Sequence, residues 1–377
     1  MRKKLLPVLI MAFITLSFSV AATTALVPSI ARYFKVNPIS AGRLVWLYML
    51  PYGFFALLWA PLTHKFQINR LFAFNMGMFS LSALGLTFTS SIQMAFIFRF
   101  LMGIFASSFV PLGLIIIGKE VPAKKKSKYI GLLFSLSFFS SLVGVFLSGI
   151  LFWRLIYFIS AILAGVSVYL IVRLDSLDYR RENINISYIS TLRDKGVLRL
   201  FLFIGTASFL YHGIQQWLAV FMAQEYGFAQ FKISSALTLA SLSAIAAENT
   251  GGLLCGKIGI AKVIEVGFFL MIGFLSVLVL FYNSLGLVIF LAIALWGFGW
   301  ALTHVGLSSV LTHLPDKFLR DASSLNSSVR FFAGGLGAVV GGKIIDLIGF
   351  KYLFCLVGTL ILGLIVLLRK KGVENVA

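Results

Sequence analysis

Twelve apolar runs, each long enough to cross a lipid bilayer, constrain this chain more than any other feature. A membrane-spanning helix needs about 20 apolar residues, and short polar connections separate the runs. They lie near residues 7–31, 43–63, 71–89, 94–118, 128–150, 153–173, 197–223, 233–256, 263–282, 285–312, 322–346 and 351–368. Strands of a membrane β-barrel would alternate apolar and polar residues, which these runs do not do. We therefore predict an all-α membrane protein with twelve transmembrane helices.

The composition agrees with a membrane protein and argues against a nucleic-acid-binding one. The chain is 60% hydrophobic and 12% charged, whereas soluble domains average about 45–50% apolar and about 25% charged residues. Its formal net charge of +20 comes from Lys and Arg clusters between apolar runs, with no basic face or aromatic stacking module around them. We expect the lipid bilayer and a small molecule as partners, and no nucleic acid.

The distribution of basic residues predicts the orientation. If the N-terminus is cytoplasmic, 23 of the 32 Lys and Arg residues fall in cytoplasmic segments and 7 in outer segments, as the positive-inside rule requires. Only Arg99 and Arg330 are predicted to lie at bilayer depth rather than near the ends of the runs. The first run resembles a signal peptide, but it continues to Ile30 and is predicted to stay as a span. Both termini should be cytoplasmic, and the short loops indicate a bacterial inner membrane.

The chain divides into two similar halves. The longest polar stretch predicts a cytoplasmic central loop at 174–196, between an N-terminal six-helix bundle at 1–173 and a C-terminal one at 197–377. "GVFLSG" from Gly144 is echoed by "GAVVGG" from Gly337, and each precedes an aromatic and basic helix start. Two pseudo-symmetric bundles of this kind are typical of secondary transporters, whose substrate site lies near the mid-membrane where the repeats meet.

Several motifs resemble the Major Facilitator Superfamily, in particular its bacterial drug-efflux-like branch. "RFLMGIFASSFVPLGLIIIGKE" is similar to the fourth-helix motif of that family, with Arg99 and Gly103 in the Arg and Gly positions. "SSLNSSVRFFAGGLGAVVGG" is similar to its eleventh helix, and "FWRLIYF" to the start of its sixth helix. The resemblance covers the whole chain and implies the major facilitator fold.

Two family motifs are altered. The loop between the second and third helices, "APLTHKFQINR", keeps the basic Lys65 and Arg70, but His64 stands where the family has Asp. By resemblance these three residues would close a cytoplasmic gate. In the fifth helix, Gly144-Val145 replaces the Gly-Pro of the antiporter pattern.

The resemblance implies a secondary active transporter that works by alternating access around one central cavity. We expect proton-coupled efflux of a small amphipathic organic compound. The altered fifth helix leaves an uptake symporter or facilitator for a small metabolite as an alternative. A non-transporting membrane receptor or assembly factor is a third possibility, distinguished by ligand binding without flux.

Charged residues at bilayer depth are costly and usually face a cavity or a partner. Arg99 either faces the central cavity or is a structural residue that reaches the interface or binds backbone carbonyls. Glu248 is the only carboxylate predicted deep in a span, and it suits a group that loads and releases protons. Arg330 lies at similar depth, so a permanent Glu248–Arg330 ion pair is the alternative to a coupling role.

Two further sets of residues are candidates for substrate contact. On the seventh helix, His212, Gln215 and Gln216 share one face because they are spaced i, i+3 and i+4. The same spacing is predicted to group Trp296, Trp300, Thr303 and His304 on the tenth helix. Both sets could instead be structural core, and Thr15, Ser19 and Thr23 on the first helix fit helix packing as well as substrate contact.

The sequence lacks the motifs that would indicate an enzyme or an ATP-driven pump. The sequence has no G-x-x-x-x-G-K-[ST] nucleotide loop, no Ser/His/Asp set and no metal-ligand spacing. Cys255 and Cys355 lie in or beside apolar runs without Cys-x-x-Cys spacing. We expect no cofactor, no metal and no nucleotide, with the proton gradient as energy source, and a monomeric protein.

Overall fold

The computed structural model describes residues 5–174, 177, 187–282, 286 and 288–371. The described residues are helical, with turns between the helices and no strand among them. The chain divides into two compact units, Met1–Ile186 and Ser187–Ala377. This division falls within the polar stretch 174–196, where the sequence predicts the central loop.

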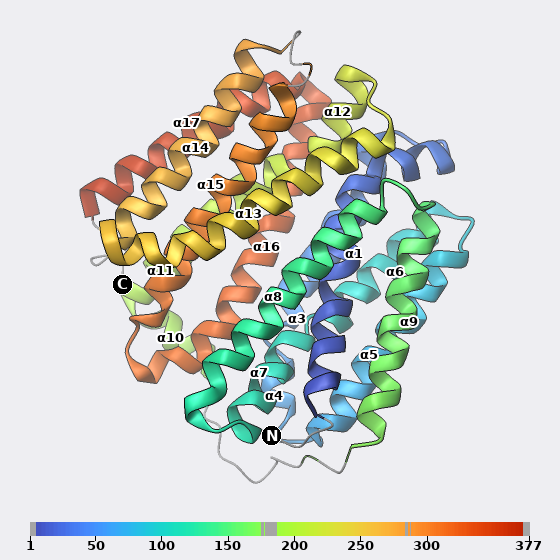
Figure 1. The fold of residues 1–377 in the computed structure, drawn as a ribbon, viewed down its shortest axis with the longest axis vertical. Helices are drawn as coiled ribbons and strands as arrows, with labels where there is room; N and C mark the ends of the chain where they lie inside the picture. The colour runs from blue at the N-terminus through green and yellow to red at the C-terminus, as the bar shows by residue number, and fades with distance from the viewer. Residues whose placement is uncertain (1–4, 175–176, 178–186, 283–285, 287, 372–377) are drawn as a thin grey trace. The chain divides into compact units, whose positions relative to one another are not determined.

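The first unit contains nine helices in its described part (Figure 1). They are α1 (Leu5–Phe34), α2 (Pro38–Ala41), α3 (Arg43–Phe55), α4 (Trp59–Leu62), α5 (Ile68–Phe88), α6 (Ile92–Ala106), α7 (Phe109–Glu120), α8 (Ala123–Leu147) and α9 (Trp153–Val172).

The second unit contains eight helices in its described part. They are α10 (Tyr188–Arg193), α11 (Lys195–Gln215), α12 (Leu218–Tyr226), α13 (Gln230–Ile258), α14 (Ile260–Leu280), α15 (Val288–Thr312), α16 (Asp316–Ile348) and α17 (Phe350–Lys371).

Ten segments of the described chain are long and apolar enough to cross a membrane. Two of them join consecutive helices, α6 with α7 and α11 with α12. Two other predicted runs are not among these ten segments: the run 43–63 forms α3 and α4, and the run 233–256 forms α13. The first pair is interrupted at residues 56–58, and α13 is a continuous helix of 29 residues whose apolar character is diluted by Ser, Thr, Asn and Glu. In the part of the chain that the structure describes, each of the twelve predicted runs is therefore helical over most of its length.

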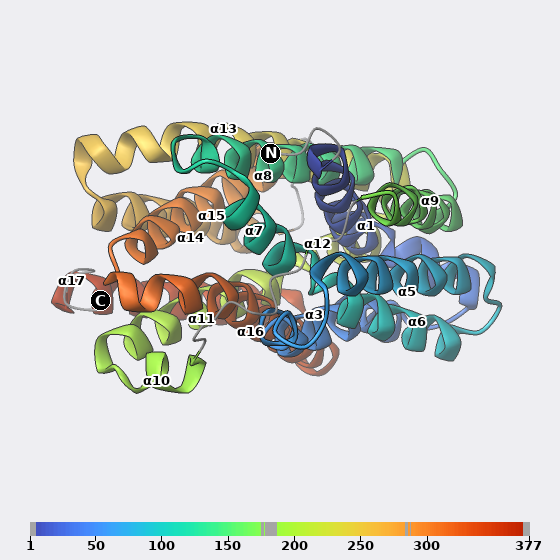
Figure 2. The ribbon, with the colours of Figure 1, turned by 90° about the horizontal axis from the view of Figure 1, so that it is seen from below.

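The two units repeat one pattern of helix contacts in the same chain order, which confirms the predicted pseudo-symmetry. In the first unit α1 packs on α8 and α9, α5 packs on α6 and α9, and α3 packs on α6. In the second unit α11 packs on α16 and α17, α14 packs on α15 and α17, and α13 packs on α15 (Figures 1 and 2). The helices α1, α3, α5, α6, α8 and α9 thus correspond to α11, α13, α14, α15, α16 and α17.

Close backbone contacts at glycines hold equivalent helix pairs together. A Cβ on Gly144 of α8 would collide with the carbonyl oxygen of Phe18 on α1. Its counterpart Gly337 of α16 stands in the same relation to Phe209 on α11. Small residues at such positions let transmembrane helices approach closely. This explains why the two glycine patterns recur in the sequence.

The outer surfaces of the helices are apolar. Leu280, Leu347 and Phe88 are 76%, 80% and 71% exposed. Meanwhile Ser and Thr side chains inside the bundles bind backbone carbonyls, as Ser140 does with Ile14 of α1 (2.8 Å). Apolar residues outside and small polar residues inside suit a lipid solvent, so the chain is a multi-pass membrane protein.

The polar stretch between the units contains one short helix in its described part, α10, that packs on α11 and α16 (Figure 2). The Asp321 carboxylate of α16 accepts hydrogen bonds from the Thr191 hydroxyl (2.8 Å) and the Ser187 amide (3.2 Å). Asp194 then caps α11 by accepting from the amides of Gly196 and Val197. This part of the predicted loop is thus built onto the second unit.

We expect Gly337→Leu to destabilise the protein strongly, because backbone on α11 occupies the space that the side chain needs. Overpacking of this kind costs about 1–3 kcal/mol or more. The measurement is the melting temperature in detergent. Gly363→Leu on α17 is the matched control, since apart from its chain neighbours and the backbone of its own helix no described atom lies within 4 Å of its added Cβ. Equal melting temperatures for the two variants would contradict the close packing of α16 on α11.

Candidate functional site

Arg99 lies in the interior of the first unit and is only 1% exposed. Its Nε donates to the carbonyl oxygen of Leu44 on α3 (2.9 Å). The guanidinium carbon stands 4.4 Å from the ring centre of Tyr48 and 5.8 Å from that of Tyr157. No ion pair joins Arg99 to a carboxylate in the described part of the chain. The side chain is therefore held by backbone and by aromatic faces.

The same contact explains the spacing of the Arg–Gly motif. Gly103 is four residues after Arg99, and a Cβ there would collide with the carbonyl oxygen of Tyr48. Tyr48 is in turn four residues after Leu44, so both motif residues face consecutive turns of α3. Glycine permits the close approach, and arginine binds the carbonyl one turn away. This arrangement supports the structural interpretation of Arg99.

The predicted gate residues lie around the connection between α4 and α5. Lys65 and Arg70 are exposed, and His64 is half-buried. Exposed basic side chains at this connection are compatible with a gate, which stays a prediction.

The polar residues of α1 are buried, and Thr23 bonds the Tyr157 hydroxyl of α9 (2.9 Å). The side chains of Thr15, Ser19 and Thr23 are all 0% exposed. Their burial supports a role in helix packing rather than in substrate contact.

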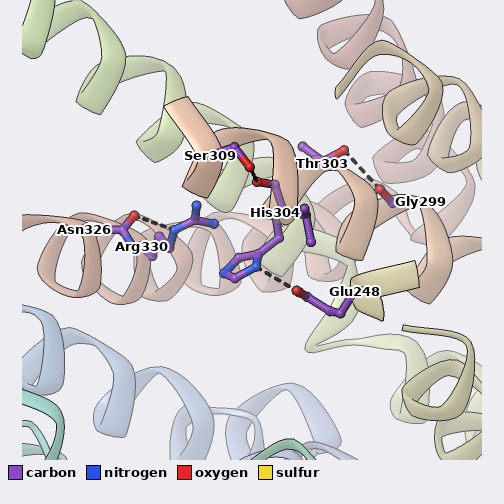
Figure 3. A network of polar contacts seen from close by, with 8 residues as sticks. Glu248, Gly299, Thr303, His304, Ser309, Asn326 and Arg330 are labelled. Carbon is purple, nitrogen blue, oxygen red and sulfur yellow. Dashed lines mark hydrogen bonds and ion pairs between the residues drawn. The ribbon is translucent and has the colours of Figure 1, made fainter. Parts of the chain in front are cut away.

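In the second unit, the polar candidates of three helices come together. Glu248 of α13 and His304 of α15 form a pair with 2.9 Å between Oε1 and Nδ1 (Figure 3). Their side chains are 26% and 31% exposed. Both side chains carry ionisable groups, and this contact joins them directly.

Arg330 of α16 belongs to the same cluster but does not form the direct ion pair with Glu248 that the sequence suggests. Its Nε donates to Oδ1 of Asn326 on the preceding turn (2.7 Å). The Glu248 carboxylate still attracts the guanidinium electrostatically. His304 takes the direct contact because α13 and α15 pack against each other.

An aromatic stack lies beside this polar cluster. Tyr211 of α11 stacks on Trp300, with ring centres 4.0 Å apart and planes within 4°. It also stacks on Trp296 at 5.2 Å. Trp300 is half-buried and reaches the rings of both His212 and His304. We call Trp296, Tyr211 and Trp300 the aromatic stack.

The side-chain amide of Gln215 ties the aromatic stack to α11, whereas that of Gln216 contacts His212 within α11. Gln215 accepts a hydrogen bond from the indole nitrogen of Trp296 (2.9 Å). The Gln216 amide nitrogen lies 3.0 Å from Nδ1 of His212. The predicted faces of the seventh and tenth helices therefore contact each other. On α15, Trp296, Trp300 and His304 lie on one face, as the spacing predicts.

Three residues differ from the sequence prediction. Thr303 bonds the carbonyl of Gly299 (3.0 Å) and faces Gly267 of α14, about 100° around α15 from the adjacent His304. Sequence reasoning missed Tyr211 and Asn326. Both stand four residues before a candidate, Gln215 or Arg330, so the i, i+4 rule could have found them.

Comparison with known proteins identifies the class. A family model described as Major Facilitator Superfamily matches residues 8–338. The chain belongs to this family of membrane transporters, as the sequence motifs indicate, and is a transporter rather than an enzyme.

Solved structures share the fold over almost the whole chain. A crystal structure of a point mutant of the nucleoside transporter NupG has a TM-score of 0.80 at 12% identity, covering 98% of this chain and 99% of that one. A second NupG structure gives 0.77 at 13% identity, with coverage of 98% and 99%. The human organic anion transporter MFSD10 gives 0.73 at 16% identity, with coverage of 97% and 99%. At these identities the likeness concerns the fold alone.

We expect Arg99→Met to leave the melting temperature unchanged or to raise it. Methionine fills a similar volume, and a buried charge without a carboxylate partner is costly. The measurement is thermal unfolding in detergent, with Arg99→Ala as the comparison because it also leaves a cavity. A clear drop for the Met variant would show that the Leu44 hydrogen bond and the tyrosine contacts outweigh the cost of burying the charge.

Proposed function

We propose that this protein is a proton-coupled secondary active transporter of a small amphipathic organic compound. It would work by alternating access in a cell membrane, with both termini cytoplasmic. The observation that carries this proposal is the Glu248–His304 pair inside a transporter of the Major Facilitator Superfamily.

The pair has the properties that a proton-coupling site needs. A carboxylate within a membrane-spanning bundle is expensive to maintain and marks a functional site by default. Glu248 is partly exposed rather than sealed, so a proton can reach it. Its partner His304 is itself titratable, and the charged Arg330 lies on a neighbouring helix. Protonation of the pair would therefore change the charge balance of three helices at once.

The aromatic stack supports an organic substrate. Ligand sites in proteins combine apolar and aromatic surface with a few polar groups that orient the ligand. Trp300 supplies such a surface next to His212 and His304. The structural relatives agree in kind, since NupG is a nucleoside transporter and MFSD10 an organic anion transporter.

Two directions of transport follow from different observations. Export in exchange for protons is what the drug-efflux-like motifs imply. Uptake by proton symport is the second candidate. The altered fifth helix favours it, because Gly144-Val145 replaces the Gly-Pro of the antiporter pattern. Flux in proteoliposomes under an imposed pH gradient of either sign separates the two directions. Ligand binding without any flux would instead support the receptor alternative.

We expect Glu248→Gln to abolish flux driven by a pH gradient while ligand binding persists, because an amide keeps the shape of the carboxyl group but carries no transferable proton. Ligands for the assay come from a thermal-stabilisation screen in detergent. Glu265→Gln on α14 is the matched control, since this carboxylate pairs with Arg369 of α17 and has no assigned coupling role. Normal pH-driven flux in Glu248→Gln would remove Glu248 from the mechanism.

A further inference from the structure

The guanidinium of Arg330 is buried, and part of it has no hydrogen-bond partner among the described residues. We call the edge formed by Nη1 and Nη2 its outer edge. The residue is 8% exposed, and its only hydrogen bond among the described residues runs from Nε to Asn326 (2.7 Å). Neither Nη1 nor Nη2 has a partner within that part of the chain. Figure 3 shows this free end on the side of Arg330 that faces His304, away from Asn326.

Unpaired donors in a buried position are costly unless an acceptor reaches them. A guanidinium has five N–H donors and cannot lose its charge, and a buried donor without an acceptor loses its hydration without compensation. The nearby carboxylate of Glu248 contacts His304 and accepts no hydrogen bond from Nη1 or Nη2 of Arg330. Two free nitrogens on one edge match the two oxygens of a carboxylate.

We propose that the outer edge of Arg330 binds the carboxylate of an organic monoanion whose aromatic or apolar body rests on Trp300. This assignment of the substrate class rests on the proposed transport function. Trp300 is half-buried and lies beside His304. Arg330 and Trp300 therefore both lie beside His304, so the charge and the aromatic ring belong to the same part of the second unit.

The charges of the cluster set how many protons accompany the anion. Arg330 and Glu248 cancel each other when His304 and His212, the other titratable groups of the cluster, are neutral. A bound monoanion then leaves one excess negative charge, and one proton on the Glu248–His304 pair restores neutrality. Charge separation is expensive in a low-dielectric interior, so anion and proton bind together. Co-binding of this kind corresponds to symport.

The direct test uses matched small molecules. Binding of 1-naphthoate, its neutral analogue 1-naphthamide, and inorganic phosphate is measured by thermal stabilisation of the purified protein in detergent. We expect only 1-naphthoate to stabilise the wild type. Arg330→Gln should lose about 10- to 100-fold in naphthoate affinity, the loss expected for a hydrogen bond to a charged group. Lys343→Gln, an exposed lysine on the same helix, should bind as the wild type does.

The outcomes either support or overturn the proposal. Equal binding of naphthoate and naphthamide would overturn it, as would a response to phosphate equal to that for naphthoate. Absence of any naphthoate effect at millimolar concentration would overturn it too. If Arg330→Gln fails to fold, Arg330→Lys serves instead. It keeps the charge but lacks the planar fork, so its affinity should fall between wild type and background.

A second measurement separates this proposal from the coupling role of Glu248. Naphthoate affinity of the wild type should rise as pH falls, by up to about tenfold per unit for one linked proton, at pH values where naphthoate stays ionised. Glu248→Gln should still bind naphthoate but lose this pH dependence. A persistent dependence in that variant would remove Glu248 from coupling and leave the Arg330 site intact. Unchanged naphthoate binding in Arg330→Gln would overturn the Arg330 site and leave the coupling role of Glu248 intact.

Discussion

The lipid interior offers no hydrogen-bond partner to a backbone amide or carbonyl, and the whole structure depends on that constraint. Helices satisfy their backbone groups internally, so every apolar run of the sequence is helical. Burial of apolar surface gives no advantage inside a solvent that is itself apolar, so close packing must hold the helices together. Gly144 and Gly337 provide it by letting one helix touch the carbonyl groups of another.

Charged side chains inside the two bundles are stabilised by two different kinds of contact. In the first unit, Arg99 is enclosed by a backbone carbonyl and two tyrosine rings, which leaves it buried. In the second unit, Glu248 and His304 compensate each other while staying partly exposed. The first arrangement joins two helices through a buried side chain, and the second leaves an ionisable pair partly exposed.

The repeat makes this asymmetry visible. Gly103 on α6 and Gly297 on α15 occupy equivalent places, since a Cβ on either would meet a carbonyl oxygen of the partner helix, Tyr48 or Ala240. Four residues before them stand Arg99 and Ile293. The buried arginine of one unit is thus replaced by an aliphatic residue in the other. The glycine contact is common architecture, whereas polar residues distinguish the units. Because fold does not imply function, the substrate must be inferred from such differences rather than from a shared fold at 12–16% identity.

The sequence by itself determined the helices, the two related halves and the grouping of Trp296, Trp300 and His304 on one face. Each of these follows from hydrophobic run length, internal repetition or the local period of the α-helix. The partners of the buried charges were decided only by the tertiary structure. Glu248 is 56 residues from His304 and still farther along the chain from Arg330, and a linear pattern does not specify how three helices rotate about their own axes. That rotation pairs the carboxylate with the imidazole, and it leaves one edge of the arginine without a partner in the described part of the chain.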